Sequence, residues 1–352
     1  MLTFRDYPKH HYGVCFNSKT GFFARLPKPG HDDPFWSPHG PEMLDISVTN
    51  WCDHECGTCY RASGRDGTHM AIADYEEILR QARDVGVLQV ALGGGNPNQH
   101  PQFCEFLRLT REVYGIVPNY TTNGRGLTLA ILHASKQYCG AVAVSAYSPY
   151  ETTEEALALL RKHAIRANVH FVVSSDTINT AISWLKSPPE FLIGTNALVF
   201  LNYKPVGRGA SPALVLNRSP FVEEFFQLAT GQSHPFKIGF DSCLASGLAA
   251  HSTVPAVFYD GCEAGRFSMF ISEDCRAYPC SFLCLTQDGP SLKEQPLHSC
   301  WSEGPAFRRI RKTLAENQCG DCLHRATCMG GCPAFPSTNV CSQARRSINA
   351  GQ

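Results

Sequence analysis

Three cysteines share the stretch Cys52-Asp53-His54-Glu55-Cys56-Gly57-Thr58-Cys59-Tyr60, at the spacing Cys-x3-Cys-x2-Cys. The stretch follows Leu44-Asp45-Ile46-Ser47-Val48-Thr49-Asn50, whose alternating apolar residues predict a strand. The cysteines are therefore expected in a loop that begins where a strand ends. Thiolates are the ligands that select iron–sulfur clusters and zinc, and four of them would saturate either site. A set of three leaves one position open for a substrate or cofactor.

Tyr60 directly follows the third cysteine, and with it the triplet resembles the signature of the radical S-adenosylmethionine (SAM) enzymes. The resemblance implies that Cys52, Cys56 and Cys59 hold a [4Fe–4S] cluster whose open iron binds SAM. Reductive cleavage of SAM, as the family performs it, yields methionine and a 5′-deoxyadenosyl radical. The alternatives are a zinc knuckle and unpaired structural cysteines. Zinc motifs usually pair two short Cys or Cys/His units, and no second unit lies nearby in the sequence.

Length and charge narrow the class of protein. A chain of 352 residues is long enough for two or three domains, and its 31 basic and 31 acidic residues balance. The balance argues against nucleic-acid binding driven by bulk charge. No apolar run reaches membrane-spanning length and the first residues lack a signal-peptide core, so we expect a cytoplasmic location. Seventeen cysteines in such a compartment indicate metal or redox chemistry.

Short apolar runs alternate with amphipathic helical stretches between residues 43 and 215. This alternation predicts a parallel sheet with right-handed crossovers. Strands are expected near 44–50, 87–93, 117–122, 140–147, 167–173 and 197–203, and helices near 74–85, 102–113, 128–137, 152–163 and 177–186. The family resemblance implies that these form a partial (β/α)6 barrel, an α/β fold with its chemistry at the carboxyl ends of the strands.

Four segments are expected along the chain. An N-terminal hairpin or cap occupies 1–42, with strands at 12–16 and 22–26, and the barrel occupies 43–215. A linking helix and strand at 216–240 follow, and Ser219-Pro220 marks the start of that helix. A cysteine-rich domain at 241–352 completes the chain.

Further stretches resemble family motifs that contact SAM. Gly93-Gly94-Gly95-Asn96-Pro97 is similar to the Gly-Gly-Glu-Pro segment, whose main chain approaches the methionine amino group and therefore needs glycine. Asn96 replaces the usual acid, which keeps a carbonyl acceptor but loses the charge. The SAM-binding residues implied by the resemblance are Tyr60, Gly94, Gly95, Asn96, Asn123, Ser145 and Arg208. The alternatives are an ordinary strand–helix turn at the glycines, a solvated Ser145 and a surface ion pair of Arg208.

Eleven cysteines lie in the last third of the chain. The order Cys319-x2-Cys322-x5-Cys328-x3-Cys332, followed by Cys341, resembles the SPASM extension of radical SAM enzymes, which holds auxiliary [4Fe–4S] clusters. The resemblance implies two such clusters, and so three in the whole chain. The proximal set is Cys243, Cys262, Cys280 and Cys332, and the distal set is Cys319, Cys322, Cys328 and Cys341.

The fourth ligand of the proximal set is the open point. Cys243 is our choice, Cys275 and Cys284 are its rivals, and an open iron that substrate could occupy is a further alternative. A zinc ribbon is the alternative for the whole tail. It would show two Cys-x2-Cys halves, and the spacing Cys328-x3-Cys332 departs from that.

SPASM enzymes as a family mostly act on peptides or protein side chains. The resemblance implies a maturase that abstracts hydrogen from a ribosomally synthesised peptide and modifies it by crosslinking, oxidation, epimerisation or backbone excision. The implied partners are the precursor peptide, an external electron donor of flavodoxin or ferredoxin type and a separate leader-recognition protein, because residues 1–40 are too few for a winged-helix domain. Direct recognition of the core peptide is the alternative to that protein. A small-molecule oxidoreductase, a sulfatase-activator-like enzyme and a non-catalytic iron–sulfur sensor are the alternatives. The sequence assigns no catalytic acid or base.

Overall fold

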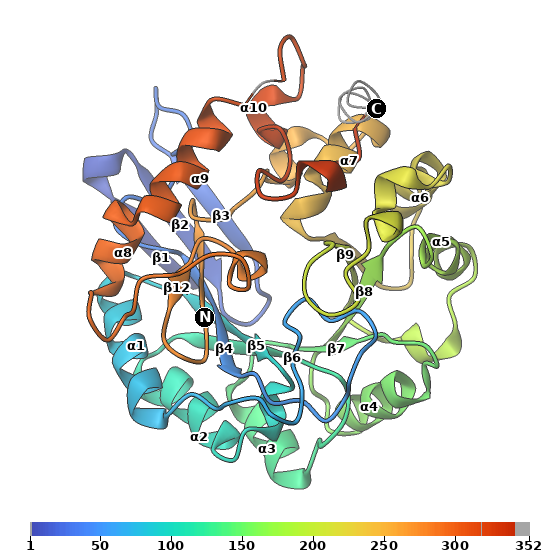
Figure 1. Cartoon of the computed structure of the whole chain (residues 1–352), viewed down its shortest axis with the longest axis horizontal. Helices are drawn as coiled ribbons and strands as arrows, with labels where there is room; N and C mark the ends of the chain where they lie inside the picture. Colours follow the sequence, from blue (N-terminus) through green and yellow to red (C-terminus); the bar gives the residue numbers. More distant parts are fainter. Residues whose placement is uncertain (1, 318, 342–352) are drawn as a thin grey trace.

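The computed structural model describes residues 2–317 and 319–341. Within them, nine strands form one sheet: β4 (Met43–Thr49), β5 (Gln89–Gly94), β6 (Val117–Thr122), β7 (Val142–Ser145), β8 (Ala167–Val173), β9 (Ala197–Asn202), β10 (Lys237–Phe240), β11 (Ser268–Ile271) and β12 (Ala277–Tyr278). Their order is β10-β9-β8-β7-β6-β5-β4-β11-β12. The sheet curves through the middle of the molecule (Figure 1).

Strands β4 to β9 pair in parallel, each with the next. The helices that join them are α1 (Ile72–Asp84), α2 (Phe103–Arg108), α3 (Leu129–Tyr138), α4 (Glu151–Lys162) and α5 (Ile178–Lys186). These helices lie along the outside of the sheet (Figure 1). The predicted α/β partial barrel is confirmed, and each expected strand and helix is present. A π-helical turn at Leu109–Val113 continues α2 to the end expected from the sequence.

The alternation of residues along β4 explains how the barrel is built. Leu44, Ile46 and Val48 are buried in the main core with residues of the outer helices. Successive side chains of a strand point to opposite faces, so Asp45 and Ser47 face the inside of the barrel. Its inner face is therefore polar near the carboxyl end of the strand.

Helix α1 shows the matching pattern on the outside of the sheet. Tyr75, Ile78, Leu79 and Ala82 are its buried residues, at the spacing of one helical face. They pack against the outward-facing apolar residues of β4 in the main core.

The N-terminal segment is a sheet of three antiparallel strands, β1 (Leu2–Tyr7), β2 (Tyr12–Asn17) and β3 (Phe23–Pro27). The hairpin of β2 and β3 matches the expectation, whereas β1 was not anticipated. Tyr12, Val14 and Phe16 pack on Leu88 and Val117, which lie at the amino-terminal ends of β5 and β6. This sheet therefore covers the end of the barrel opposite the strand carboxyl ends.

The predicted cysteine-rich domain shares the sheet of the barrel. β11 pairs in parallel with β4, and β12 extends it in antiparallel fashion. The remaining helices are α6 (Val222–Gly231), α7 (Ala245–His251), α8 (Leu297–Glu303), α9 (Pro305–Ala315) and α10 (Arg325–Cys328). Because β11 lies beside β4, the turn after β11 is brought close to the loop that follows β4.

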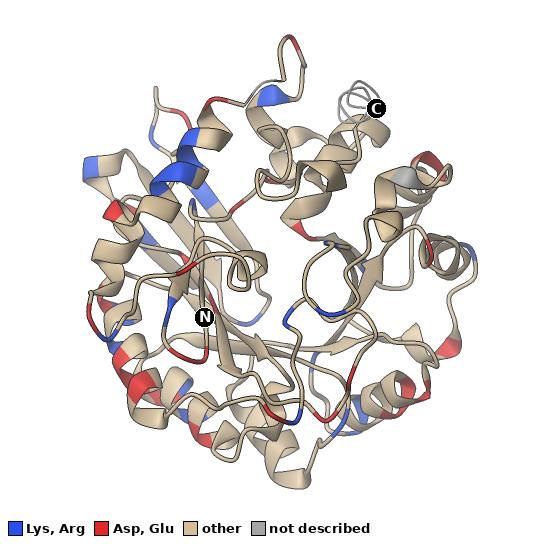
Figure 2. Cartoon of the chain, in the orientation of Figure 1, with Lys and Arg blue, Asp and Glu red and all other residues tan. Residues whose placement is uncertain are grey.

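Many charged residues lie on the outer helices, as Figure 2 shows. Arg308, Arg309 and Lys312 are exposed on α9. Within the described part of the chain, no helix combines the length and the apolar character that crossing a membrane requires.

We expect the stability of the fold to fall between about pH 6.5 and 4, in part through His100. This side chain is 5% exposed, and its Nδ1 accepts a hydrogen bond from the Gln102 N–H at 3.0 Å. Its Nε2 lies 3.0 Å from the Met70 carbonyl oxygen. Burial lowers the pKa of His100 to about 4. The unfolded chain therefore binds the proton first as pH falls, which costs up to about 3 kcal/mol at pH 4.

Urea unfolding of wild type and His100→Gln at pH 7 and pH 4.5 checks this effect. The difference in unfolding free energy between the two pH values should be smaller in the variant. An equal difference in the two proteins would show that His100 does not contribute to the pH dependence.

Candidate functional site

The three cysteines of the cluster loop, residues 52–60, lie directly after β4. Cys52 is 7% exposed, whereas Cys56 and Cys59 are half-buried. The structure brings the three together. Burial raises the pKa of Cys56 to about 11, and the thiolates of Cys59 and Cys52 raise it further. Burial likewise raises the pKa of Cys52, with Cys59 contributing.

The loop that follows β9 packs against the cluster loop and forms hydrogen bonds with its main chain. Gly207 and Gly209 have φ of +82° and +63°, and a Cβ on Gly209 would lie 1.9 Å from the Gly57 carbonyl oxygen. The main chains pair here, with the N–H of Cys59 donating to Arg208 O at 3.1 Å and that of Arg208 donating back at 2.9 Å. The two glycines are therefore required by the close approach of the backbones.

The Arg208 guanidinium has a contact that the sequence did not reveal. It donates to the carbonyl oxygens of Cys56 and Ala62, at 3.4 and 3.1 Å, and also to that of Ser63. In this structure Arg208 thus ties the middle of the cluster loop to the residues that follow the loop. Its contact with the SAM carboxylate stays a prediction.

The glycine segment after β5 packs on the backbone that leads into the cluster loop. Gly94 has φ of +111°, and a Cβ there would lie 2.1 Å from Thr49 O. A Cβ on Gly95 would lie 2.0 Å from Trp51 O. Side chains at these two positions would push the cluster loop away from the sheet, so glycine is needed for packing as well as for the predicted approach of SAM.

Asn96 is fully buried and its hydrogen bonds explain why an amide stands here. Its Oδ1 accepts from Thr122 Oγ1 at 3.0 Å and from the Asn123 N–H at 3.2 Å. Its Nδ2 donates to Arg125 O at 3.2 Å. A carboxylate could make the first two bonds but not the third, because it has no donor. Asn96 thus ties the glycine segment to the turn after β6.

We expect Asn96→Asp to lower the unfolding free energy by about 1–3 kcal/mol, because the carboxylate would face the Arg125 carbonyl without a donor between them. Chemical denaturation of the two proteins measures the difference. Asn179→Asp is the matched control, since Asn179 is exposed on α5, and its effect should stay within about 0.5 kcal/mol. A stability of Asn96→Asp equal to that of wild type would contradict the assigned role of the amide.

The other predicted SAM-binding residues surround the same loop. Asn123 Nδ2 donates to Asp53 Oδ1 at 3.1 Å and lies 3.8 Å from Cys52 Sγ. Ser145 stands at the end of β7, in register with His170 of β8. The ring centroid of Tyr60 is 4.9 Å from that of Phe282, in the cysteine-rich segment. All therefore lie at or near the carboxyl ends of the strands.

Tyr147 is a site residue that the sequence analysis missed. Its ring centroid lies 5.8 Å from that of His54, and its hydroxyl lowers the pKa of the Cys56 thiol through a hydrogen bond. Tyr147 follows the predicted Ser145 by two positions. The family motif at the end of β7 therefore indicated the correct segment, but it identified Ser145 alone as a site residue.

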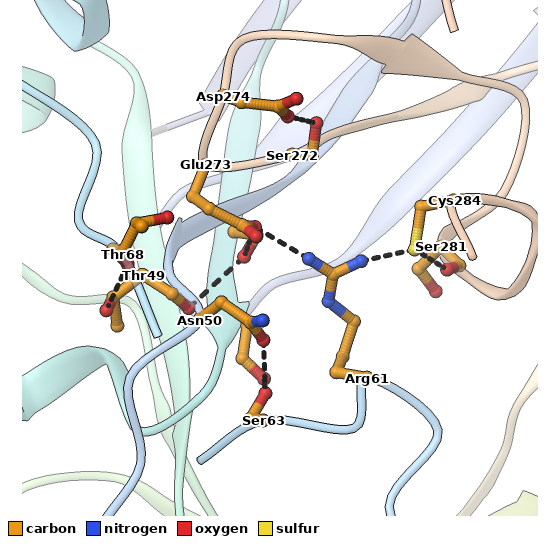
Figure 3. A network of polar contacts seen from close by, with 12 residues as sticks. Thr49, Asn50, Arg61, Ser63, Thr68, Ser272, Glu273, Asp274, Ser281 and Cys284 are labelled. Carbon is orange, nitrogen blue, oxygen red and sulfur yellow. Dashed lines mark hydrogen bonds and ion pairs between the residues drawn. The ribbon is translucent and has the colours of Figure 1, made fainter. Parts of the chain in front are cut away.

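Figure 3 shows a second group that the sequence did not reveal, centred on Arg61. Arg61 directly follows Tyr60 and is 3% exposed. It donates to Glu273 Oε2 at 2.6 Å and to the sulfur of Cys284. Glu273 Oε2 also accepts from Ser47 Oγ at 2.7 Å. Since Glu273 lies in the turn between β11 and β12, this network joins the cluster loop to the cysteine-rich segment.

Asp45 faces the same guanidinium from inside the barrel. Burial raises the pKa of its carboxyl to about 6, and Arg61 opposes that rise. Asp45 makes no side-chain hydrogen bond with the residues that the structure describes. Arg61 therefore provides the positive charge for two carboxylates, Glu273 and Asp45.

The cysteines of the proximal set lie close to one another in the structure. A thiol–thiol hydrogen bond joins Cys243 to Cys332, and it raises the pKa of the first and lowers that of the second. Burial raises the pKa of Cys262 to about 12, and Cys332 adds to the rise. Burial also raises the pKa of Cys280, with contributions from Cys262 and Cys332.

The two rivals of Cys243 lie elsewhere. Cys275 is buried near the ion pair of Asp74 and Lys293. Cys284 faces Arg61 (Figure 3). The structure thus places Cys243, and neither rival, beside the other proximal cysteines.

The distal set also converges, at the C-terminal end of the described chain. Burial raises the pKa of Cys328 to about 11, and Cys341 and Cys319 add to the rise. Burial raises the pKa of Cys319 as well, with Cys322 and Cys341 contributing. All seventeen cysteines of the chain are free thiols.

Residues 46–170 match the model of the Radical SAM superfamily. That range contains the cluster loop, the glycine segment and the end of β7. The comparison therefore assigns a radical SAM domain to residues 46–170.

Curated relatives and solved structures cover most of the chain. It is 22% identical over 327 residues to mycofactocin maturase MftC of Mycobacterium ulcerans, covering 84% of this chain and 83% of that protein. Streptococcus suis SuiB bound to the precursor peptide SuiA aligns with a TM-score of 0.71, at 17% identity and over 92% of each chain. Native anSMEcpe with bound AdoMet aligns with a TM-score of 0.63, at 17% identity, over 88% of this chain and 96% of that one. These structural likenesses establish the fold.

Proposed function

We propose that this chain is a radical SAM maturase of a ribosomally synthesised peptide, which abstracts hydrogen from the peptide and modifies it by crosslinking, oxidation, epimerisation or backbone excision. The observation that carries the proposal is that the three cysteines of the cluster loop lie at the carboxyl end of β4, in a chain that also gathers Cys243, Cys262, Cys280 and Cys332 in one buried group. The relatives support it, since MftC is named a maturase and SuiB was solved with a precursor peptide.

The proposed cofactors are SAM and three [4Fe–4S] clusters, held by the cluster loop, the proximal set and the distal set. Among residues 2–317 and 319–341, no three His, Cys, Asp or Glu side chains are close enough to share one metal ion. Ligands of a four-iron cluster bind different irons, so they stand farther apart than the ligands of one zinc ion. The donors present are all thiols, which are the ligands that iron–sulfur clusters select, and each later set supplies the four that saturate a cluster.

When bound, SAM and the cluster of the loop would supply the deoxyadenosyl radical. The chain itself holds and shapes the site. Arg208 and the two glycines beside it fix the cluster loop on the barrel. Polar residues such as Asp45 and Ser47 line the inside of the barrel below it. The rings of Tyr60 and Phe282, whose centroids are 4.9 Å apart, connect the cluster loop to the segment that follows Cys280.

The proposed partners are the precursor peptide, a separate leader-recognition protein and an external electron donor of flavodoxin or ferredoxin type. We also propose a cytoplasmic location, where free thiols would be kept reduced. Neither nucleic acid nor membrane has a part in the proposed activity.

Peptide-dependent SAM cleavage tests the function. Anaerobically reconstituted protein is given SAM, dithionite and synthetic short peptides encoded near the gene, each compared with a scrambled peptide of equal composition. We expect one peptide to increase formation of 5′-deoxyadenosine and to change in mass, whereas its scrambled form does neither. Cleavage that responds only to a small molecule would favour the small-molecule oxidoreductase, and clusters without any cleavage would favour the sensor.

A further inference from the structure

A lysine is buried at the end of β9, beside the proximal cysteines. Lys204 is 3% exposed, and its Nζ donates to Thr338 Oγ1 at 2.8 Å. Thr338 lies between Cys332 and Cys341 in the sequence. Lys204 forms no ion pair with any carboxylate of the described residues.

Hydrogen bonds hold the elements around this ammonium together. Asn202 Nδ2 donates to Cys243 O at 3.2 Å and to Thr338 O at 3.1 Å. The N–H of Cys332 donates to Asn339 Oδ1 at 2.7 Å. The end of β9, the Cys243 segment and the chain after Cys332 therefore meet at Lys204.

An isolated buried ammonium is costly, so a buried lysine needs a compensating negative charge. Asp241 is a carboxyl whose charge interacts with that of Lys204. Burial raises the pKa of this carboxyl to about 6, and its Oδ1 is buried without a hydrogen-bond partner among the described residues. The other groups that face Lys204 are cysteines. Burial lowers the pKa of Lys204, and Cys243, Cys332, Asp241 and Cys280 raise it by more.

We propose that Lys204 is a charge-compensating residue for the cluster held by Cys243, Cys262, Cys280 and Cys332, and that its ammonium raises the reduction potential of that cluster. The inference rests on the proposed function, because it requires the proposed proximal cluster. It assigns a role to a residue that belongs neither to the cluster loop nor to the predicted SAM-binding residues.

The direction of the effect follows from charge. Four thiolates around a [4Fe–4S] core of charge 2+ leave a net charge of about −2, and one-electron reduction makes it about −3. A fixed positive charge nearby stabilises the more negative state by more, since Coulomb attraction grows with the product of the charges. Lys204 thus favours the reduced state, which suits a cluster that accepts an electron during peptide oxidation.

The test is a redox titration of the reconstituted full-length protein, in which electron paramagnetic resonance monitors the signal of each cluster. The proximal signal is identified as the one lost in Cys280→Ser. We expect Lys204→Met, which keeps the length of the side chain without its charge, to shift this midpoint to a lower potential. Lys204→Arg keeps the charge and should leave it close to the wild-type value. The signals of the other two clusters should not move in either variant.

An unchanged proximal midpoint in Lys204→Met, with iron content equal to wild type, overturns the proposal. If Lys204→Met fails to retain the proximal cluster while Lys204→Arg retains it, the requirement for charge is supported by iron content alone. Loss of the cluster in both variants would assign Lys204 a packing role and overturn the proposal. Because no peptide is present, these results do not depend on the activity; a wild-type protein without a proximal signal would instead refute the proposed cofactor set.

Discussion

Replacement of Cys52, Cys56 and Cys59 by alanine should reduce SAM cleavage to the background of the assay and remove about four of about twelve irons per chain. The three thiols converge in one loop at the carboxyl end of β4, where Cys59 and Cys52 contribute to the raised pKa of Cys56. Without them, nothing in the loop can present an iron with an open position. Iron content and formation of 5′-deoxyadenosine in anaerobically reconstituted protein measure both effects.

Cys104→Ala is the matched control, because Cys104 is a half-buried thiol on α2, outside all three sets. It should keep both the iron and the cleavage. Cleavage that survives in the triple variant would mean that the radical chemistry arises at another cluster, and the interpretation of the loop would be wrong.

The second large effect is expected for Arg61→Met, which should lower the unfolding free energy by about 3–5 kcal/mol. Arg61 and Glu273 are 3% and 13% exposed, and their atoms lie 2.6 Å apart. Removing the guanidinium leaves Glu273 and Asp45 inside the protein without the positive charge that both face. Breaking one side of a buried pair is costly because the remaining charge is neither solvated nor compensated.

Denaturant unfolding of Arg61→Met and of Arg80→Met measures this effect against a matched control. Arg80 pairs with Glu77 at 2.6 Å, but both side chains are about half exposed, so its loss should cost less than about 1 kcal/mol. Adding Glu273→Gln to Arg61→Met should recover part of the stability, because one of the two stranded charges is then removed. Equal losses in Arg61→Met and Arg80→Met would show that the network in Figure 3 does not stabilise the fold.

The same network has a consequence for the site. Its hydrogen bond between Arg61 and Glu273 connects the end of the cluster loop to the turn between β11 and β12. It therefore helps to fix the position of the cluster loop relative to the cysteine-rich segment. In Arg61→Met we therefore expect the cluster of the loop to be lost more readily than the distal one, which lies far along the chain from Glu273. Iron release during mild chelation would report the order of loss.

The strand–helix alternation and the cysteine spacings were sufficient to predict most of the framework. Alternating residues such as Leu44, Asp45 and Ile46 encode which face of a strand is buried, and that is a local property. Short spacings such as Cys319-x2-Cys322 constrain how thiols can converge, but the division into two four-cysteine sets is what the resemblance to the SPASM extension implied. Strand β1 and the pairing of β11 with β4 were not predicted, because strand pairing depends on partners that are distant in the sequence.

The sequence by itself therefore determined the parallel barrel and the position of the three-cysteine loop after its first strand, since periodicity and short spacings act over a few residues. Only the tertiary structure decided which groups share a buried environment. Arg61 meets Glu273 across 212 positions and Lys204 meets Thr338 across 134, and no local pattern records such contacts. The tertiary structure also decided that Asn96 must donate as well as accept. In each case the reason is that a buried polar group needs a partner, and the fold alone determines which residue supplies it.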